Sequence, residues 1–126
     1  MSQTLQGHTD LVRAVAISPD GKKAVSGSYD DTLKVWDLVR GGEVRTLKGH
    51  IDLVFAVAIT PDGKKAVSGA DDKTLRVWDL ERGLQVRTFK GESAIFSVAL
   101  AADGRTAVAG AASGRVHHLK KGAAGE

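Results

Sequence analysis

Apolar and polar residues alternate in short segments along the chain, and turn-forming residues separate these segments. Residues 11–17, 22–28, 32–38 and 43–47 each alternate with a period of two, which predicts four short antiparallel strands. Between the first two, Ser-Pro-Asp-Gly at 18–21 predicts a tight turn, because proline presets φ and glycine supplies a positive φ. We expect the first strand to be partly buried through Val12, Val15 and Ile17.

The whole pattern returns after 42 residues. Residues 7–38 and 49–80 are identical at 25 of 32 positions, and a third unit begins at Gly91 with an offset of 41 after a one-residue deletion near Ser93. A fixed period of this length predicts repeats that bury their apolar faces against one another. Four short strands per unit are typical of a β-propeller blade. The sequence therefore predicts an all-β chain of three four-stranded antiparallel blades, at about 7–47, 49–89 and 91–121, within a single partial propeller over residues 1–126.

The two ends of the chain are out of step with these blades. Residues 2–7 match 44–49 and 86–91, which contain the fourth strands of the first two units. The last predicted strand is 115–120, and residues 121–126 carry no fourth strand for the third unit. We expect residues 2–6 of another copy to supply that strand by β-strand addition. The residues expected to form this closure are Ser2, Gln3, Thr4 and Leu5 on one chain and Arg115, Val116, His117, His118 and Leu119 on the other.

Four motifs at fixed offsets resemble those of the WD-repeat family of β-propellers. They are Gly-His at 7–8, Ser-Pro-Asp-Gly at 18–21, Ser-Gly-x-x-Asp at 26–30 and Trp-Asp at 36–37. The resemblance covers essentially the whole chain, fully in the first two units and partly in the third. It implies a hydrogen-bonded tetrad inside each typical blade. These tetrads are His8, Ser26, Asp30 and Trp36, and then His50, Ser68, Asp72 and Trp78.

The third unit replaces all four tetrad members, with Glu92, Ala109, Ser113 and Leu119. Without the tetrad, we expect apolar packing alone to hold this blade, so that it is the softest of the three.

A serine, a histidine and an aspartate also make up a hydrolase triad. A nucleophile has to be exposed beside an oxyanion hole, whereas the resemblance places these groups under a tryptophan inside the blade. We therefore assign the tetrads a structural role and predict no catalytic residues.

One position varies within an otherwise constant strand. Arg13, Phe55 and Phe96 occupy equivalent sites in LVRAVA, LVFAVA and AIFSVA. The resemblance implies that this position lines the mouth of the central channel, on the face that captures peptides. Aromatic side chains beside an arginine are a plausible anchor for a protein partner, although drift without function remains the alternative interpretation.

Composition narrows the remaining function classes. The net charge of +3 is spread along the chain, which argues against a nucleic-acid partner. There are no cysteines, and His117 and His118 point to opposite faces of a predicted strand, so we expect no metal site and no cofactor. No apolar run is long enough to span a bilayer, and we expect a cytoplasmic protein with no membrane partner.

We therefore expect a non-catalytic protein-interaction scaffold whose copies assemble into a complete propeller that binds an unknown protein or peptide. Two copies would give six blades and three copies nine, and the homodimer is favoured over the homotrimer because six is closer to common propellers. The alternative is a C-terminal sensor or regulatory fragment of a larger bacterial-type signalling protein. A hydrolase and a nucleic-acid binder are weaker alternatives.

Overall fold

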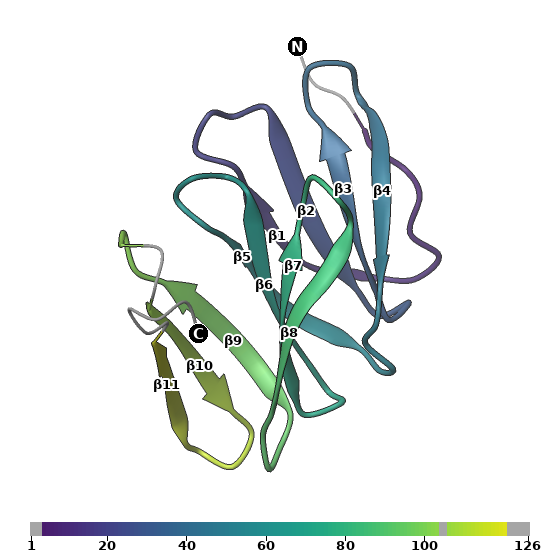
Figure 1. Ribbon diagram of the computed structural model, residues 1–126. Helices are drawn as coiled ribbons and strands as arrows, with labels where there is room; N and C mark the ends of the chain where they lie inside the picture. Colours follow the sequence, from purple (N-terminus) through teal and green to yellow (C-terminus); the bar gives the residue numbers. More distant parts are fainter. Residues whose placement is uncertain (1–3, 104–105, 121–126) are drawn as a thin grey trace.

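The computed structural model describes residues 4–103 and 106–120, which form three separate antiparallel sheets (Figure 1). Blade 1 contains β1 (Val12–Ile17), β2 (Lys23–Ser28), β3 (Thr32–Asp37) and β4 (Gly42–Lys48), paired in that order. Blade 2 repeats the order with β5 (Val54–Ile59), β6 (Lys65–Ala70), β7 (Thr74–Asp79) and β8 (Leu84–Lys90). Blade 3 contains β9 (Ile95–Leu100), β10 (Thr106–Ala111) and β11 (Val116–Lys120). The predicted all-β class is confirmed. The described residues include no helix long and apolar enough to cross a membrane.

The hairpin turns follow the chemistry of their residues. In blade 1 the amide of Gly21 donates to the carbonyl of Ser18 at 2.9 Å, and Gly21 has a φ of 73°. Ser18 also donates its hydroxyl to Asp20, so that side chains reinforce the backbone turn. Blade 2 builds the same turn with Thr60 in place of Ser18. The repeat is therefore preserved in turn geometry as well as in strand order.

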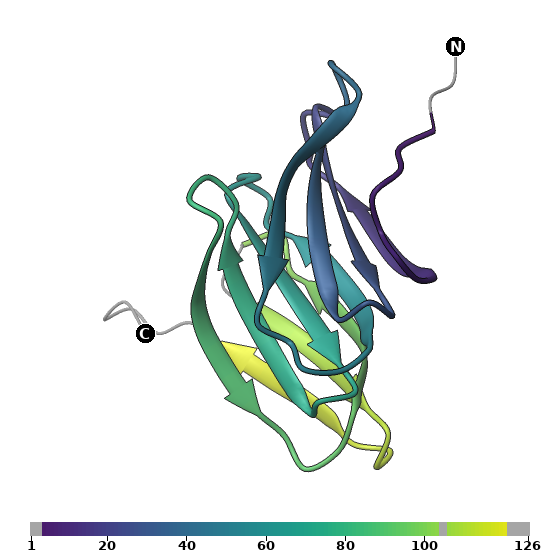
Figure 2. The same cartoon turned by 90° about the vertical axis from the view of Figure 1, so that its right-hand side faces the viewer.

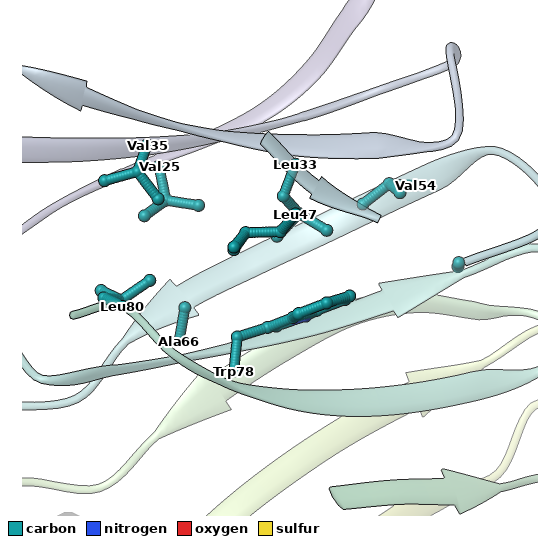
Figure 3. Packing of buried hydrophobic residues seen from close by; sticks show 9 residues of the cluster. Val25, Leu33, Val35, Leu47, Val54, Ala66, Trp78 and Leu80 are labelled. Atoms are coloured by element: carbon teal, nitrogen blue, oxygen red, sulfur yellow. The ribbon is translucent and has the colours of Figure 1, made fainter. Parts of the chain in front are cut away.

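The blades stack through their faces, with the first strands β1, β5 and β9 side by side (Figures 1 and 2). We call the side of a blade that meets the preceding blade its front face, and the opposite side its rear face. Figure 3 shows the first junction, where the rear of blade 1 meets the front of blade 2. The rear of blade 1 contributes Val25, Leu33, Val35 and Leu47, and the front of blade 2 contributes Val54, Ala66, Trp78 and Leu80.

The second junction uses equivalent positions one repeat further along. Val67 and Leu75 on the rear of blade 2 pack against Ile95 and Ala109 on the front of blade 3, with Leu119 at the margin. Full burial of a valine or leucine side chain contributes about 1.5–3 kcal/mol. The blades are therefore held to one another by apolar contact between faces, and Trp78 of the blade 2 tetrad lies in the first of these junctions.

Two faces of the stack have no partner within the described residues. On the front of blade 1, Val12, Val15 and Ile17 are 52%, 68% and 64% exposed. The expected partial burial of these three side chains is therefore wrong for the single chain. The equivalent residue of blade 2, Val54, is fully buried because blade 1 covers it. The rear of blade 3 is likewise open, with Val108 39% and Val116 69% exposed.

Candidate functional site

The tetrad of blade 2 is a continuous chain of buried hydrogen bonds. Trp78 Nε1 donates to the hydroxyl of Ser68 at 2.8 Å, and that hydroxyl lies 2.6 Å from His50 Nε2. The other ring nitrogen, His50 Nδ1, lies 2.8 Å from a carboxylate oxygen of Asp72. These contacts fit a neutral histidine with its proton on Nδ1, which donates to the carboxylate while Nε2 accepts from the serine. Every polar side-chain group of this tetrad then has a hydrogen-bond partner, as burial requires.

Blade 1 contains the same arrangement. Trp36 Nε1 donates to the hydroxyl of Ser26 at 2.7 Å. His8 Nε2 lies 2.6 Å from the same hydroxyl, and His8 Nδ1 lies 2.7 Å from a carboxylate oxygen of Asp30. The network has a fifth member that the sequence did not predict. Thr32 donates its hydroxyl to the second oxygen of Asp30 at 2.5 Å. Thr74 does the same for Asp72 in blade 2 at 2.5 Å. The signal was a threonine two residues after the aspartate in both units, but threonine is also common in strands.

This network shifts the titration of its members. Burial alone would raise the pKa of Asp30, but hydrogen bonds from Thr32, His8 and backbone amides outweigh burial and lower it to about 2. The same balance lowers the pKa of Asp72. Burial also lowers the pKa of His50, although Asp72 opposes part of that shift. The tetrad of blade 2 therefore favours an ionised carboxylate beside a neutral imidazole.

The order serine, histidine, aspartate within each tetrad is also the order of a hydrolase triad. The hydroxyl of Ser68 is fully buried and already bonded to both Trp78 and His50, so a substrate cannot reach it. Ser26 is 4% exposed and makes the same contact with Trp36. The geometry therefore accounts for both serines as parts of a packed hydrogen-bond network.

Blade 3 has the same strand frame without the network. Ala109 and Leu119 pack in the junction with blade 2, at the positions of a tetrad serine and tryptophan. Glu92, at the histidine position, forms an exposed ion pair with Arg115 at 3.0 Å. Ser113, at the aspartate position, donates its backbone amide to the hydroxyl of Ser93.

Aromatic side chains form a row across the three blades. Phe55 and Phe96 have ring centroids 4.8 Å apart, and Tyr29 meets Phe55 edge to face at 6.0 Å. Phe96 is 48% exposed and Arg13 is exposed on blade 1. The structure therefore brings the two predicted phenylalanines together. It adds Tyr29, which the repeat comparison missed because Asp71 occupies the equivalent position of blade 2.

Acidic groups gather at the same end of the blades. Burial raises the pKa of Asp31, and the nearby charges of Asp52, Asp30, Asp72 and Asp10 raise it further. A carboxyl group responds in this way when it lies in a negative local potential. This end of the stack therefore combines one exposed and two half-buried aromatic rings with negative charge.

The free edge of blade 3 is the β11 edge, since β11 pairs only with β10 among the described strands. The predicted closure residues Val116, His117, His118 and Leu119 all lie on this strand, and Arg115 directly precedes it. Of their expected partners, Thr4 and Leu5 are described, whereas Ser2 and Gln3 lie outside the described residues. The ring nitrogen Nε2 of His117 is buried and has no hydrogen-bond partner within the described part of the chain.

A cavity of about 450 Å³ opens on the front face of blade 1. Apolar side chains of Leu5, Val12, Val15 and Trp36 form part of its wall. The polar residues Gln6, His8, Asp10 and Ser26 and the small residues Gly7 and Ala24 form the rest. In blade 2 the equivalent surface is covered by blade 1. The cavity therefore marks the place on blade 1 where a preceding blade would pack. Residues 4–103 and 106–120 contain no cluster of three or more potential metal ligands.

Four-stranded antiparallel sheets that stack face to face, with their first strands side by side, define a β-propeller type of repeat protein. Residues 1–37, 41–79 and 83–118 match the family model for the WD domain, G-beta repeat. The chain belongs to this family, as the motifs of its first two units predict. The second and third matched units each begin with a strand that completes the preceding sheet: β4 pairs with β3 in blade 1, and β8 pairs with β7 in blade 2.

The curated relatives share a short segment with this chain. The ribosome biogenesis protein BOP1 homologs of Drosophila melanogaster, Drosophila erecta and Drosophila willistoni are each 48% identical to it over 44 residues. The segment is 35% of this chain and 6% of each relative. The chain therefore matches a small share of these relatives' length, close to one repeat.

Proposed function

We propose that this chain is a non-catalytic protein-interaction scaffold that completes its propeller with further copies of itself. The phase of the family repeat carries this proposal. The first strand of the second unit, β4, completes blade 1, and the first strand of the third unit, β8, completes blade 2. The equivalent segment of the first unit, residues 2–6, has no blade to complete within the described residues, and β11 of blade 3 has a free edge there. A donated strand would satisfy both.

The open faces support the same association. The front of blade 1 exposes aliphatic side chains at positions that are buried in blade 2, and it contains the 450 Å³ cavity. The rear of blade 3 exposes Val108 and Val116 at positions where blades 1 and 2 bury Val25 and Leu33 or Val67 and Leu75. A second copy would cover one face with the other, as the two internal junctions do. Exposed apolar faces and strand edges of this kind otherwise favour aggregation.

We expect two copies and six blades, with three copies and nine blades as the rival. The mass of the full chain in solution, measured by light scattering at micromolar concentration, tests this directly. Deletion of residues 1–6 is expected to abolish the closed species, whereas deletion of residues 122–126 leaves it unchanged. A full chain that stays monomeric would overturn the proposal, as would a deletion of residues 1–6 that assembles normally.

The end of the stack that carries Tyr29, Phe55 and Phe96 is the proposed binding face. Aromatic rings supply apolar anchors, and the surrounding carboxylates favour basic residues in the partner. The expected ligand is therefore a protein or peptide segment with apolar and basic residues. Peptides selected on the assembled protein should lose affinity on Phe96→Ala and keep it on Val39→Ala, an exposed residue of the β3–β4 turn.

The alternative is a C-terminal sensor or regulatory part of a larger signalling protein, in which blades upstream would cover the front of blade 1. The similarity to ribosome biogenesis proteins extends over one repeat and supports the repeat rather than a shared pathway. A hydrolase would need Ser26 as nucleophile at the cavity, and activity lost on Ser26→Ala with the fold intact would support it. A nucleic-acid ligand would show a steep salt dependence. We expect the scaffold to act in the cytoplasm.

A further inference from the structure

We propose that the junction between copies is built around His117 and His118 and closes only when both imidazoles are neutral. This inference rests on the proposed self-association and concerns how that association is controlled. Both residues lie on β11, the strand that would receive the N-terminal segment of the next copy. At the equivalent positions, blades 1 and 2 have a cationic residue and a valine instead of two histidines. This difference determines which protonation state of the histidines the junction can bury.

His118 stands where blade 1 has a fully buried valine and blade 2 a half-buried one. In blade 1, Val25 lies directly opposite Val35 across β2 and β3, and both are fully buried against blade 2. Blade 2 repeats the pair with Val67 and Val77. In blade 3 the same cross-strand pair is Val108 and His118, both exposed on the open rear face. If this face packs as the other two do, an imidazole enters an apolar junction.

A protonated imidazole is poorly suited to that environment. The surface it would meet on the next copy is the front of blade 1, formed by Val12, Val15, Ile17 and Trp36. Burial of a charged group without a partner is far more costly than burial of the neutral form. His118 therefore favours the closed junction only after it has lost its proton.

His117 stands where the other blades have a cation with partners. Lys34 contacts Glu43 at 3.0 Å and Thr46 at 2.8 Å on the outer strand. Arg76 makes the equivalent contact with Gln85 at 2.6 Å, and it also lies 4.0 Å from Asp72. The outer strand therefore supplies the partners of this position.

The donated strand would supply a different set of partners. By the repeat offset, Thr46 corresponds to Thr4 and Glu43 to Met1, while Asp72 corresponds to Ser113. The hydroxyl of Thr46 is thus retained in Thr4, whereas the carboxylates of Glu43 and Asp72 have no counterpart. A neutral His117 can accept from Thr4, which would satisfy its buried Nε2, but a protonated ring finds no counter-ion at these positions.

The remaining charged groups around the two histidines are mostly cationic. On the chain that carries them these are Arg115, already paired with Glu92, and, on the rear side of β8, Arg87. The donated residues 2–6 carry no charge, although the strands they match contain Arg45 and Arg87. From the next copy the cavity presents His8 and Asp10, and Asp10 is exposed at its rim.

Acid should therefore open the junction between copies while it leaves the two internal junctions in place. Histidine is the side chain that ordinarily gains its proton between about pH 5 and pH 8. Each imidazole that has to be neutral for burial weakens association about tenfold for every pH unit below its titration. We expect the dissociation constant of the full chain to rise at least about tenfold from pH 8 to pH 5.5.

The test measures self-association of the full chain by analytical ultracentrifugation at pH 8 and pH 5.5. The comparison is the double variant His117→Gln and His118→Val, which keeps His8 and His50 in their tetrads. The wild type is expected to dissociate at pH 5.5, and the double variant is expected to remain associated at both values. Circular dichroism at both values checks that the blades themselves stay folded. The single variant His118→Val should show an intermediate pH dependence, which also covers a folding defect of the double variant.

Three outcomes overturn the inference. A wild type that associates equally at both pH values shows that the histidines do not control the junction, and it leaves the proposed function intact. Equal acid dissociation of wild type and both variants places the sensitive group elsewhere. If the wild type does not associate even at pH 8, the proposed self-association itself fails, and this inference fails with it.

Discussion

Blade 2 and blade 3 share one strand frame and differ in what fills it. In blade 2 a tryptophan, a serine, a histidine and an aspartate are joined by hydrogen bonds of 2.6 to 2.8 Å. In blade 3 the corresponding positions hold Leu119 and Ala109, which pack in the junction, and Ser113 and Glu92, which make contacts at the surface. The first three strands keep the same order and the same antiparallel pairing in both blades.

The difference shows that the network stabilises the blade without defining it. Alternating apolar residues and the turn chemistry suffice for the strand frame of blade 3. A buried polar network is favourable only when every member has a partner, and a partial network is worse than an apolar core. Blade 3 has lost all four members together, which avoids the unpartnered groups that a single replacement would leave behind.

The largest expected effect comes from breaking the network of blade 2 at one member. Trp78→Leu, which installs the residue of blade 3, removes the donor to Ser68 and leaves a cavity beside Ala66 and Leu80. We expect a loss of about 3 kcal/mol in the free energy of unfolding, from the lost volume and the unpartnered hydroxyl together. Urea denaturation followed by circular dichroism measures the loss.

The matched control is Leu119→Ala in blade 3, at the equivalent position. Leu119 is half-buried and has no side-chain hydrogen bond to lose, so we expect about 1.5 kcal/mol. An effect at Leu119 as large as the effect at Trp78 would show that packing alone stabilises both blades.

A smaller effect is expected from acid, which should weaken blades 1 and 2 more than blade 3. The pKa of Asp30 is lowered to about 2 from its ordinary value of 3.8, and the pKa of Asp72 is also lowered. Their contribution is therefore present above about pH 4 and is lost as the pH falls, through about 2 for Asp30. For Asp30, which is largely buried, the loss is about 2 kcal/mol. Because the pKa of His50 is lowered, the unfolded chain binds its proton first, and stability also declines below about pH 6.5.

Hydrogen exchange followed by mass spectrometry resolves this effect by blade. Amides of β2 and β6 should lose protection between pH 7 and pH 3, after correction for intrinsic exchange, whereas amides of β10 should change least because blade 3 lacks these groups. Variants Asp30→Asn and Asp72→Asn should flatten the profile. Equal loss of protection in all three blades would remove the tetrads as the source of the acid sensitivity.

The repeat itself made most of the fold predictable from the sequence. The predicted strand at 22–28 corresponds to β2 (Lys23–Ser28) and the one at 32–38 to β3 (Thr32–Asp37), because alternation and turn residues are local signals. The exposure of Val15 was not predictable in this way, because the pattern marks a side chain as core without showing whether a neighbouring blade covers it. Val57, at the same position in blade 2, packs against the core cluster between blades 1 and 2.

Comparison of repeats finds the residues that recur and misses those that do not. The resemblance to WD repeats implied the tetrads, and all four members of each recur in the first two units. Tyr29 occurs once and joins the aromatic row only because the stacked blades bring it to Phe55. Thr32 recurs as Thr74, but a threonine in a strand has an ordinary explanation, and its bond to the aspartate depends on side-chain geometry.

The smallest expected effect lies in the ion pair that blade 3 has at the position of the lost histidine. Arg115→Ala removes the contact with Glu92, in which both side chains are largely exposed. Exposed pairs contribute about 0.2–1 kcal/mol because water and salt screen the charges and both side chains lose freedom. We therefore expect a loss below about 0.5 kcal/mol in the urea midpoint analysis, and no measurable loss in 0.5 M salt. A loss comparable to that of Trp78→Leu would mean that this surface ion pair stabilises blade 3 as strongly as the buried network stabilises blade 2.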